Sequence, residues 1–389
     1  MDYIFPVTEI EYHIIDFLDP LIDFMQLSLV SKYYYEHVTN DKVYVALKDF
    51  YLNRPKINFL MKGLINEEIN FILACEYNHI LVAKYLQHKY NSSNTIQINI
   101  HASNELAFKY TCKNGHLMIA KWLYRLGKKI NSPINFYDQQ LANLIHISDE
   151  SAFSWACSSG QLEVVNWLYH LGKKMNFPID IHSYDEYVFR HTCENGHLKT
   201  AEWLYLLGKN VDSPIDIHAL HEYAFQIVCK NGYLEIAKWL YHLGKQINSP
   251  INIHIGSELA FRWACESGHS EIAEWLYHLA IKLNFPIDIH IGNELAFRWA
   301  CKSGHSEIAE WLYYLGITLE NPIDIHAENE YAFRYACSKG HLKVAKWLYH
   351  LGITLENPID IHAGNESACS NNHLKVVKWL YTLDNKYHH

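Results

Sequence analysis

Residues 292–305 read GNELAFRWACKSGH, and residues 306–316 continue as SEIAEWLYYLG. The first stretch predicts a helix, because Phe297, Ala300 and Cys301 recur at helical spacing on one face. In the second stretch, apolar residues stand at positions i, i+3, i+4 and i+7, which is the pattern of an amphipathic helix. Together the two stretches predict a helix, a turn and a second helix.

The ends of the first helix carry residues that favour helix termini. Asn293 is placed as the N-cap, since its side-chain oxygen can accept from a free backbone N–H group, and Glu294 favours the first turn. Gly304 can close the helix, because glycine adopts the left-handed conformation without a steric penalty. Other copies of the stretch carry at the N-cap position Asn104, Asp149, Asp185, Ser257 or Asn329.

The stretch recurs along the chain with a fixed period. Five successive steps, from Gly160 to Gly340, are 36 residues long, and one earlier step is longer because residues 136–144, FYDQQLANL, are inserted. Each of the nine cysteines stands three residues before the residue that is equivalent to Gly304 in its own copy. The chain is therefore predicted to be an array of nine units that bury their apolar faces against one another. The positions equivalent to Gly304 are Asn78, Gly115, Gly160, Gly196, Gly232, Gly268, Gly304, Gly340 and Asn372.

A short connection, NPIDIH at residues 321–326, joins one unit to the next. Proline fixes its own φ angle, and Ile323 and Ile325 alternate with Asp324 and His326. This alternation predicts an extended, hairpin-like segment.

Cys265 and His269 are four residues apart, a spacing that could hold a metal ion. Gly268 turns the chain between them, however, and a structural zinc site needs four ligands at close range. The alternative is that the cysteine packs in the core as a small apolar residue. We favour the packing interpretation and predict no metal and no other cofactor.

The second-helix consensus of the copies, GHLEIAKWLYxLG, resembles that of the ankyrin repeat over about residues 67–384. The resemblance implies an all-α fold, an ankyrin-like helix-turn-helix solenoid of nine repeats with extended or hairpin connections. The unit departs from the family in its length of 36 residues rather than about 33. Its first helix opens with Glu-Leu-Ala-Phe or Glu-Tyr-Ala-Phe in place of the family's Thr-Pro-Leu-His.

Residues 1–50 precede the array and differ from it. The segment resembles an F-box, a helical motif that docks adaptors onto the Skp1 subunit of cullin–RING ubiquitin ligases. The resemblance rests on Phe5-Pro6, Leu18-Asp19-Pro20 and LSLVSK at residues 27–32, and tyrosine stands where tryptophan is usual. The alternative is a plain helical cap on the first repeat. The resemblance implies a Skp1-docking surface formed by Pro6, Ile14, Leu18, Leu27, Val30 and Ser31.

The remaining segments complete the predicted organisation. Residues 51–66 are expected to be a linker or capping segment, and residues 385–389 a C-terminal tail. The formal charge of −9 argues against nucleic-acid binding, and the absence of any apolar run of 18 residues argues against a membrane span. The odd number of cysteines suits a reducing compartment. We therefore expect a cytoplasmic, monomeric protein.

The chain lacks the GxGxxG, GKT/S, HExxH and GxSxG motifs, so we predict no enzymatic activity. The two resemblances together imply an adaptor, in which the repeats hold an unknown target protein and the F-box-like segment recruits a Skp1–cullin ligase. The alternative is a scaffold or decoy that binds a partner without a ligase. F-box and ankyrin modules in one chain are similar to host-directed proteins of large DNA viruses, which implies the host cytosol.

Ankyrin-type arrays usually bind partners through their hairpin tips and first helices. We expect contacts at positions that vary among the copies, at first-helix arginines and in the insertion. The histidines of the connections, such as His290 and His326, are expected at the tips. The predicted contact residues are Phe136, Tyr137, Tyr184, Arg190, Leu220, His221, Arg262, Arg298 and Arg334.

Overall fold

The computed structural model describes residues 66–92, 98–130, 134, 151–364 and 373–387. The F-box-like segment 1–50, the insertion 136–144 and the six predicted Skp1-docking residues lie outside these ranges. Within the described ranges every regular element is a helix, as the sequence predicts, and no strand is present. The all-α prediction is confirmed.

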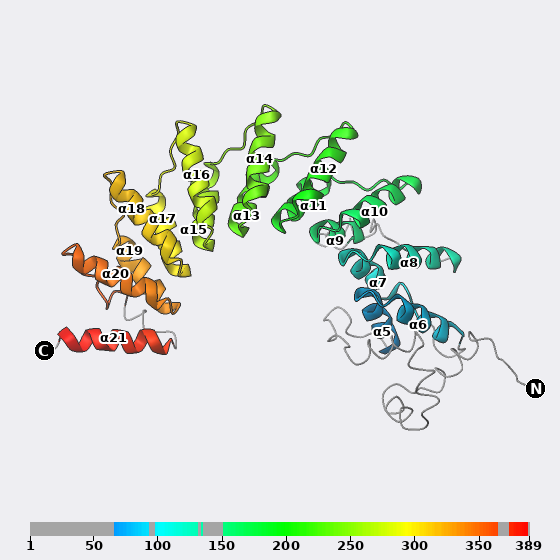
Figure 1. Cartoon of the computed structure of the whole chain (residues 1–389), viewed down its shortest axis with the longest axis horizontal. Coiled ribbons are helices and arrows are strands. Elements are labelled where there is room, and N and C mark those ends of the chain that lie inside the picture. Colours follow the sequence, from blue (N-terminus) through cyan, green and yellow to red (C-terminus); the bar gives the residue numbers. More distant parts are fainter. Residues whose placement is uncertain (1–65, 93–97, 131–133, 135–150, 365–372, 388–389) are drawn as a thin grey trace, which may run out of the picture. The chain divides into compact units, whose positions relative to one another are not determined.

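Each repeat contributes a first helix and a second helix, except that the described part of the last repeat holds only its second helix, α21 (Figure 1). The first helices are α5 (Asn66–Glu76), α7 (Ala102–Lys113), α9 (Ala152–Ser158), α11 (Ser183–Glu194), α13 (Ala219–Asn231), α15 (Ile255–Ser267), α17 (Ile291–Ser303) and α19 (Ala327–Ser338). The second helices are α6 (Ile80–Ser92), α8 (Leu117–Lys129), α10 (Leu162–Lys174), α12 (Leu198–Asn210), α14 (Leu234–Gln246), α16 (Ser270–Lys282), α18 (Ser306–Thr318), α20 (Leu342–Thr354) and α21 (Leu374–Tyr387).

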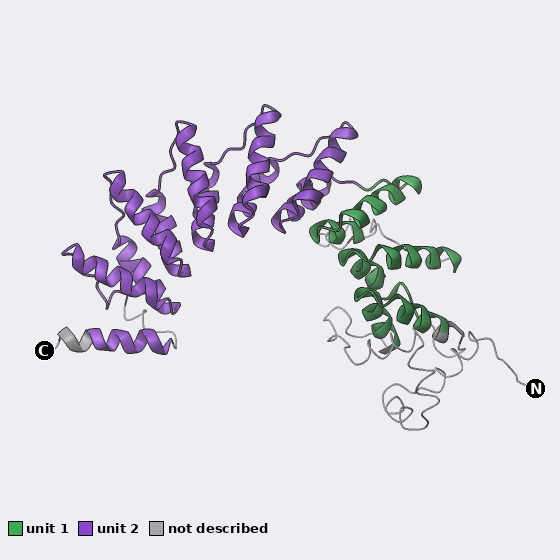
Figure 2. Ribbon diagram, in the orientation of Figure 1, with its two compact units in different colours: residues 1–179 green, residues 180–389 purple. Residues whose placement is uncertain are grey.

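The chain divides into two compact units, Met1–Ile179 and Asp180–His389 (Figure 2). In the first unit, α5 packs on α7 and α7 packs on α9. In the second unit, each first helix packs on the next in the order α11, α13, α15, α17 and α19. Each of these helices also packs on the second helix of its own repeat. Stacking of first helices is therefore the main contact within each unit.

Within each compact unit, an aromatic contact joins one repeat to the next. Phe297 is fully buried on α17, and its ring centroid lies 6.1 Å from that of Trp347 on α20. Tyr313 of α18 meets the same tryptophan edge-on at 6.1 Å. A pair of this kind contributes about 0.5–1.5 kcal/mol beyond the area that it buries. The equivalent phenylalanine–tryptophan pairs are Phe71–Trp122, Phe108–Trp167, Phe189–Trp239, Phe225–Trp275, Phe261–Trp311 and Phe333–Trp379.

The predicted N-cap at Asn293 is wrong. Gly292, Asn293 and Glu294 all have left-handed backbone angles, with Asn293 at φ 56° and ψ 62°, and no side chain caps the start of α17. Asparagine suits this turn because its short polar side chain tolerates the left-handed region. The same conformation occurs at Asn104, Asp185, Ser257 and Asn329, while Asp149 lies outside the described residues.

The connection between repeats alternates as predicted. Ile323 and Ile325 are buried, whereas Asp324 is exposed between them. At its start, Asn321 N donates to Gly316 O at 3.0 Å, so the segment closes on the end of its own second helix. In the described part of the chain these extended segments form no strand pairs.

The Gly-His pair that marks each repeat is an inter-repeat contact. Gly268 has φ +88°, and a Cβ atom added there would lie 2.5 Å from Cε1 of His305 in the following repeat. Gly304 has the same relation to His341, with 2.4 Å to its Nδ1. The glycine is required both by its backbone angle and by the imidazole above it.

We predict that Gly268→Ala lowers the melting temperature, because alanine is strained at this φ and its methyl group displaces His305. The left-handed conformation alone costs an L-residue about 1–2 kcal/mol. Thermal unfolding followed by circular dichroism measures the change. Gly244→Ala is the control for the backbone angle, since this glycine is helical; its added Cβ would lie 2.7 Å from Ser249 O, and the chain already places an alanine at the equivalent Ala280 one repeat later. A control that melts as low as Gly268→Ala would contradict the explanation.

Candidate protein interface

The left-handed turns at the N-terminal ends of the first helices display exposed side chains that differ from copy to copy. Tyr184 is 51% exposed and Leu220 is 49% exposed, and both occupy the first position of their turns, with φ 55° and 54°. His221, the next residue after Leu220, is also exposed. These three predicted contact residues lie on neighbouring repeats, because α11 packs on α13. The same first position holds Ser103, Gly256, Gly292 and Glu328 in other copies.

The predicted arginines lie beneath these turns. Arg298 is only 7% exposed, and its Nε and Nη2 donate to the carbonyls of Asn293 and Gly292 at 2.6 and 2.7 Å. Its guanidinium also lies 4.8 Å from the ring centroid of Tyr331 in the next repeat. Because the side chain is buried and two of its N–H groups bind carbonyls of the turn, we assign Arg298 the role of holding the turn.

The other arginines make similar contacts. Arg190 is as buried as Arg298 and donates to Asp185 O and Tyr184 O at 2.7 and 2.9 Å. Arg262 and Arg334 are half-buried and also donate to carbonyls of their own turns. The sequence could not distinguish these roles, because the burial of each arginine depends on the repeat that follows it.

The connection histidines belong to a ladder of polar contacts between repeats. His290 Nδ1 donates to Glu294 Oε1 at 2.9 Å, and the same oxygen accepts from Asp324 N of the next connection at 3.3 Å. Asp324 Oδ1 then accepts from His326 N, and His326 donates to Glu330. We call this series the Asp-His-Glu ladder; its histidine–glutamate pairs are His101–Glu105, His182–Glu186, His218–Glu222, His254–Glu258, His290–Glu294 and His326–Glu330.

The ladder places its carboxylates inside the array. Glu294 and the equivalent glutamates are buried, and their histidines are half-buried rather than fully exposed at a tip. Burial raises the pKa of Glu258, while the hydrogen bond from His254 opposes this rise. The aspartates and histidines of the connections thus serve the junction between repeats, which the sequence motif alone did not indicate.

The histidines of the Gly-His pairs are also tied to the preceding repeat. His116 Nε2 donates to Glu76 O at 2.9 Å, and His305 and His341 bond to backbone groups of Glu266 and Lys302. Burial lowers the pKa of all three imidazoles. Repulsion from neighbouring histidines lowers the pKa of His305 and His341 further.

Cys265 is fully buried in α15, where it packs as predicted, and burial raises the pKa of its thiol. His269, the other half of the spacing, instead lies over Gly232 of the preceding repeat. Within the described ranges, no group of three or more histidine, cysteine or acidic residues could hold a metal ion.

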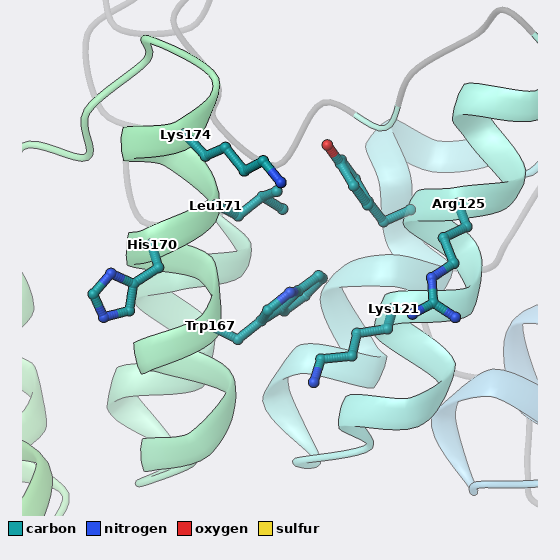
Figure 3. Close-up of a pocket in the computed structure, with 7 residues that line it drawn as sticks. Lys121, Arg125, Trp167, His170, Leu171 and Lys174 are labelled. Carbon is teal, nitrogen blue, oxygen red and sulfur yellow. The ribbon is translucent and has the colours of Figure 1, made fainter.

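One pocket lies between the second helices α8 and α10 (Figure 3). It has a volume of about 340 Å³. Sequence reasoning missed it; a comparison of charges at equivalent second-helix positions could have found it. The lining residues are Lys121, Tyr124, Arg125, Trp167, His170, Leu171 and Lys174.

Comparisons with known proteins support the repeat assignment. Family models of ankyrin repeats match residues 188–287 and 297–349, so these segments are similar to ankyrin repeats. A search of curated proteins found no match. Among solved structures, an ankyrin repeat family protein from Legionella pneumophila is similar at 17% identity, covering 83% of this chain and 97% of that protein, with a TM-score of 0.27. No helix of the described residues is long and apolar enough to cross a membrane.

We predict that stability falls as the pH drops below about 6.5, the ordinary pKa of histidine. Below this pH the histidines of the unfolded chain become protonated. In the folded chain His116, His305 and His341 stay neutral to a lower pH, because their pKa values are lowered. The loss continues until the pH reaches the lowered values of the folded state. Melting temperatures between pH 7.5 and pH 5.5 measure it.

The matched variant replaces these three histidines with glutamine, which the chain already uses at the equivalent Gln161 over Gly115. Its melting temperature should change less with pH than that of the native chain. An identical pH dependence would assign the effect to other groups.

We predict that Arg298→Met lowers the stability by about 1–3 kcal/mol, because the carbonyls of Gly292 and Asn293 lose a buried, charged donor. Arg298→Gln should be milder, since the equivalent Gln226 donates to His221 O at 2.8 Å. Thermal unfolding of the isolated chain provides the comparison. If Arg298→Met left the melting temperature unchanged but weakened target capture, Arg298 would be a contact residue instead.

Proposed function

We propose that the chain is a protein-binding adaptor. Its ankyrin repeats indicate a protein-binding scaffold, and the proposal adds that the F-box-like segment recruits a Skp1–cullin ubiquitin ligase to the captured target. Ligase recruitment is supported by the F-box resemblance of residues 1–50 alone. The proposal includes no catalytic step in this chain and no cofactor, and it places the protein in the cytosol that contains the ligase, a host cytosol for a viral protein.

The binding function is supported mainly by a contrast within the turns, whose backbone conformation is constant while their exposed side chains vary. The turns keep one backbone conformation, while Tyr184, Leu220 and His221 present side chains that no other described copy has at their positions. Side chains that serve only the fold would repeat with it, as the buried Phe297 does. We therefore place the main target contact on the left-handed turns at the start of α11 and α13, with Phe136 and Tyr137 of the insertion as further candidates.

The alternative function is a scaffold or decoy that binds a partner and recruits no ligase. It differs from the adaptor only in the role of residues 1–50. Both functions require the same repeat surface, so the decisive experiment must alter the two parts separately.

The test is a pulldown of the tagged full chain from eukaryotic cytosol, with bound proteins identified by mass spectrometry. We predict that Skp1 and a cullin are recovered with the native chain. They should be lost with the double variant Leu18→Asp, Val30→Asp, because aspartate on the apolar docking surface opposes its burial. Recovery of targets without Skp1 by both forms would support the scaffold or decoy instead.

A second variant, Tyr184→Ser with Leu220→Ser, should lose targets but keep Skp1. Its matched control is Leu206→Ser with Tyr314→Ser, which removes two side chains of similar exposure from the second helices α12 and α18. If the control lost the same targets as the turn variant, the turns would not be the contact surface.

A further inference from the structure

The pocket between α8 and α10 combines an apolar floor with a basic rim. Its floor is formed by Trp167 and Leu171, which point from α10 toward α8 in Figure 3, together with Tyr124. Its volume of about 340 Å³ is at the small end of the range for ligand pockets, about 300–1,000 Å³. The space suits one large apolar side chain better than a bulky cofactor.

The floor is held in place by contacts on both sides. The ring of Tyr124 meets Trp167 edge-on at 6.2 Å, and its hydroxyl lies 3.2 Å from Sδ of Met175. Trp167 also packs on the buried ring of Phe108, with centroids 6.2 Å apart. The pocket is therefore formed before any ligand arrives, which lowers the entropy cost of binding.

The rim is strongly basic. Lys121, Arg125 and Lys174 line it, and Nζ of Lys128 lies 5.0 Å from the centroid of the Tyr124 ring. Among the described residues, no carboxylate forms an ion pair with any of these four cations. The one acid on the two helices is Glu163, in the first turn of α10.

The aromatic frame recurs between other pairs of second helices, whereas the charge beside it varies: α14 and α20 also carry lysine at the position of Lys121, as Lys238 and Lys346, but among the described second helices only α8 has an arginine at the position of Arg125. Between α16 and α18, Tyr277 and Trp311 repeat the edge-on contact at 6.0 Å. The equivalents of Lys121 on these helices are Glu274 and Glu310, so the same frame there carries negative charge. A purely structural position would not need such a reversal.

We propose that this pocket binds an acidic peptide segment of a target protein. One apolar side chain of the segment lies against Trp167 and Leu171, and carboxylates on either side of it pair with Lys121, Arg125 and Lys174. The inference rests on the proposed protein-binding function and names the chemistry of a second contact, away from the turns. A peptide fits better than a nucleic acid, because the floor is apolar and the whole chain carries a charge of −9.

The test measures fluorescence anisotropy of the full chain with a labelled synthetic peptide that has a central leucine between runs of glutamate. We expect saturable binding that weakens as salt increases, since the rim charges are screened. The triple variant Lys121→Glu, Arg125→Glu, Lys174→Glu should bind about tenfold more weakly or worse. The matched control, Lys199→Glu, Lys209→Glu, Lys282→Glu, changes the same charge at exposed positions elsewhere and should bind as the native chain does.

Two control probes complete the test. A peptide with serine in place of the leucine should bind more weakly, and one with glutamine in place of glutamate should not bind. Equal binding of the native chain and the triple variant would overturn the inference, as would equal competition by a single-stranded oligonucleotide. Melting temperatures verify that both variants are folded. A chain that captures targets but binds no acidic peptide would contradict only this inference and leave the proposed function in place.

Discussion

The contact between a phenylalanine of one repeat and the tryptophan of the next is the interaction on which the array depends. A single helix pair has two apolar faces and cannot bury both alone. At Phe261 and Trp311 the rings are 6.1 Å apart, and this spacing changes little at the other described junctions. Because the contact is so regular, each junction sets the same register for the helices around it. The polar ladder and the arginine–tyrosine contacts of the turns cross the same junctions and therefore depend on that register.

Each junction has three layers, and each layer excludes a different kind of residue. The Asp-His-Glu ladder links the connections of neighbouring repeats, and the phenylalanine and tryptophan rings pack between their helices. The Gly-His contact joins the turns between the first and second helices. A residue in any layer must satisfy its own repeat and a neighbour at once. Such residues recur with the period because a change would disturb two repeats. The positions left free to vary face solvent, and these are the positions that can serve recognition.

The sequence predicted the helices, the period and the buried cysteines, because each depends on apolar spacing within one repeat. It did not predict the turn at Asn293, since asparagine is equally suited to an N-cap and to the left-handed region. The decisive partner is Arg298, whose guanidinium reaches back to the carbonyls of that turn. Arginine on a helix face looks like a surface residue when the next repeat is unknown. The candidate pocket was missed for a related reason, because its aromatic residues and several of its lysines recur in other second helices, and only Arg125 distinguishes it.

The backbone conformation of the turns is determined by the surrounding repeats and not by the residue at each turn position. Tyr184, Leu220 and Glu328 have φ angles of 55°, 54° and 57°, close to the 66° of Gly256 at the same position. A side chain in this region costs about 1–2 kcal/mol relative to glycine. The hydrogen bonds from Arg190 and Arg334 to the turn carbonyls offset part of that penalty. The frame thus tolerates tyrosine, leucine, glutamate or glycine without a change in path, so the residues shown to a partner can change while every junction stays the same.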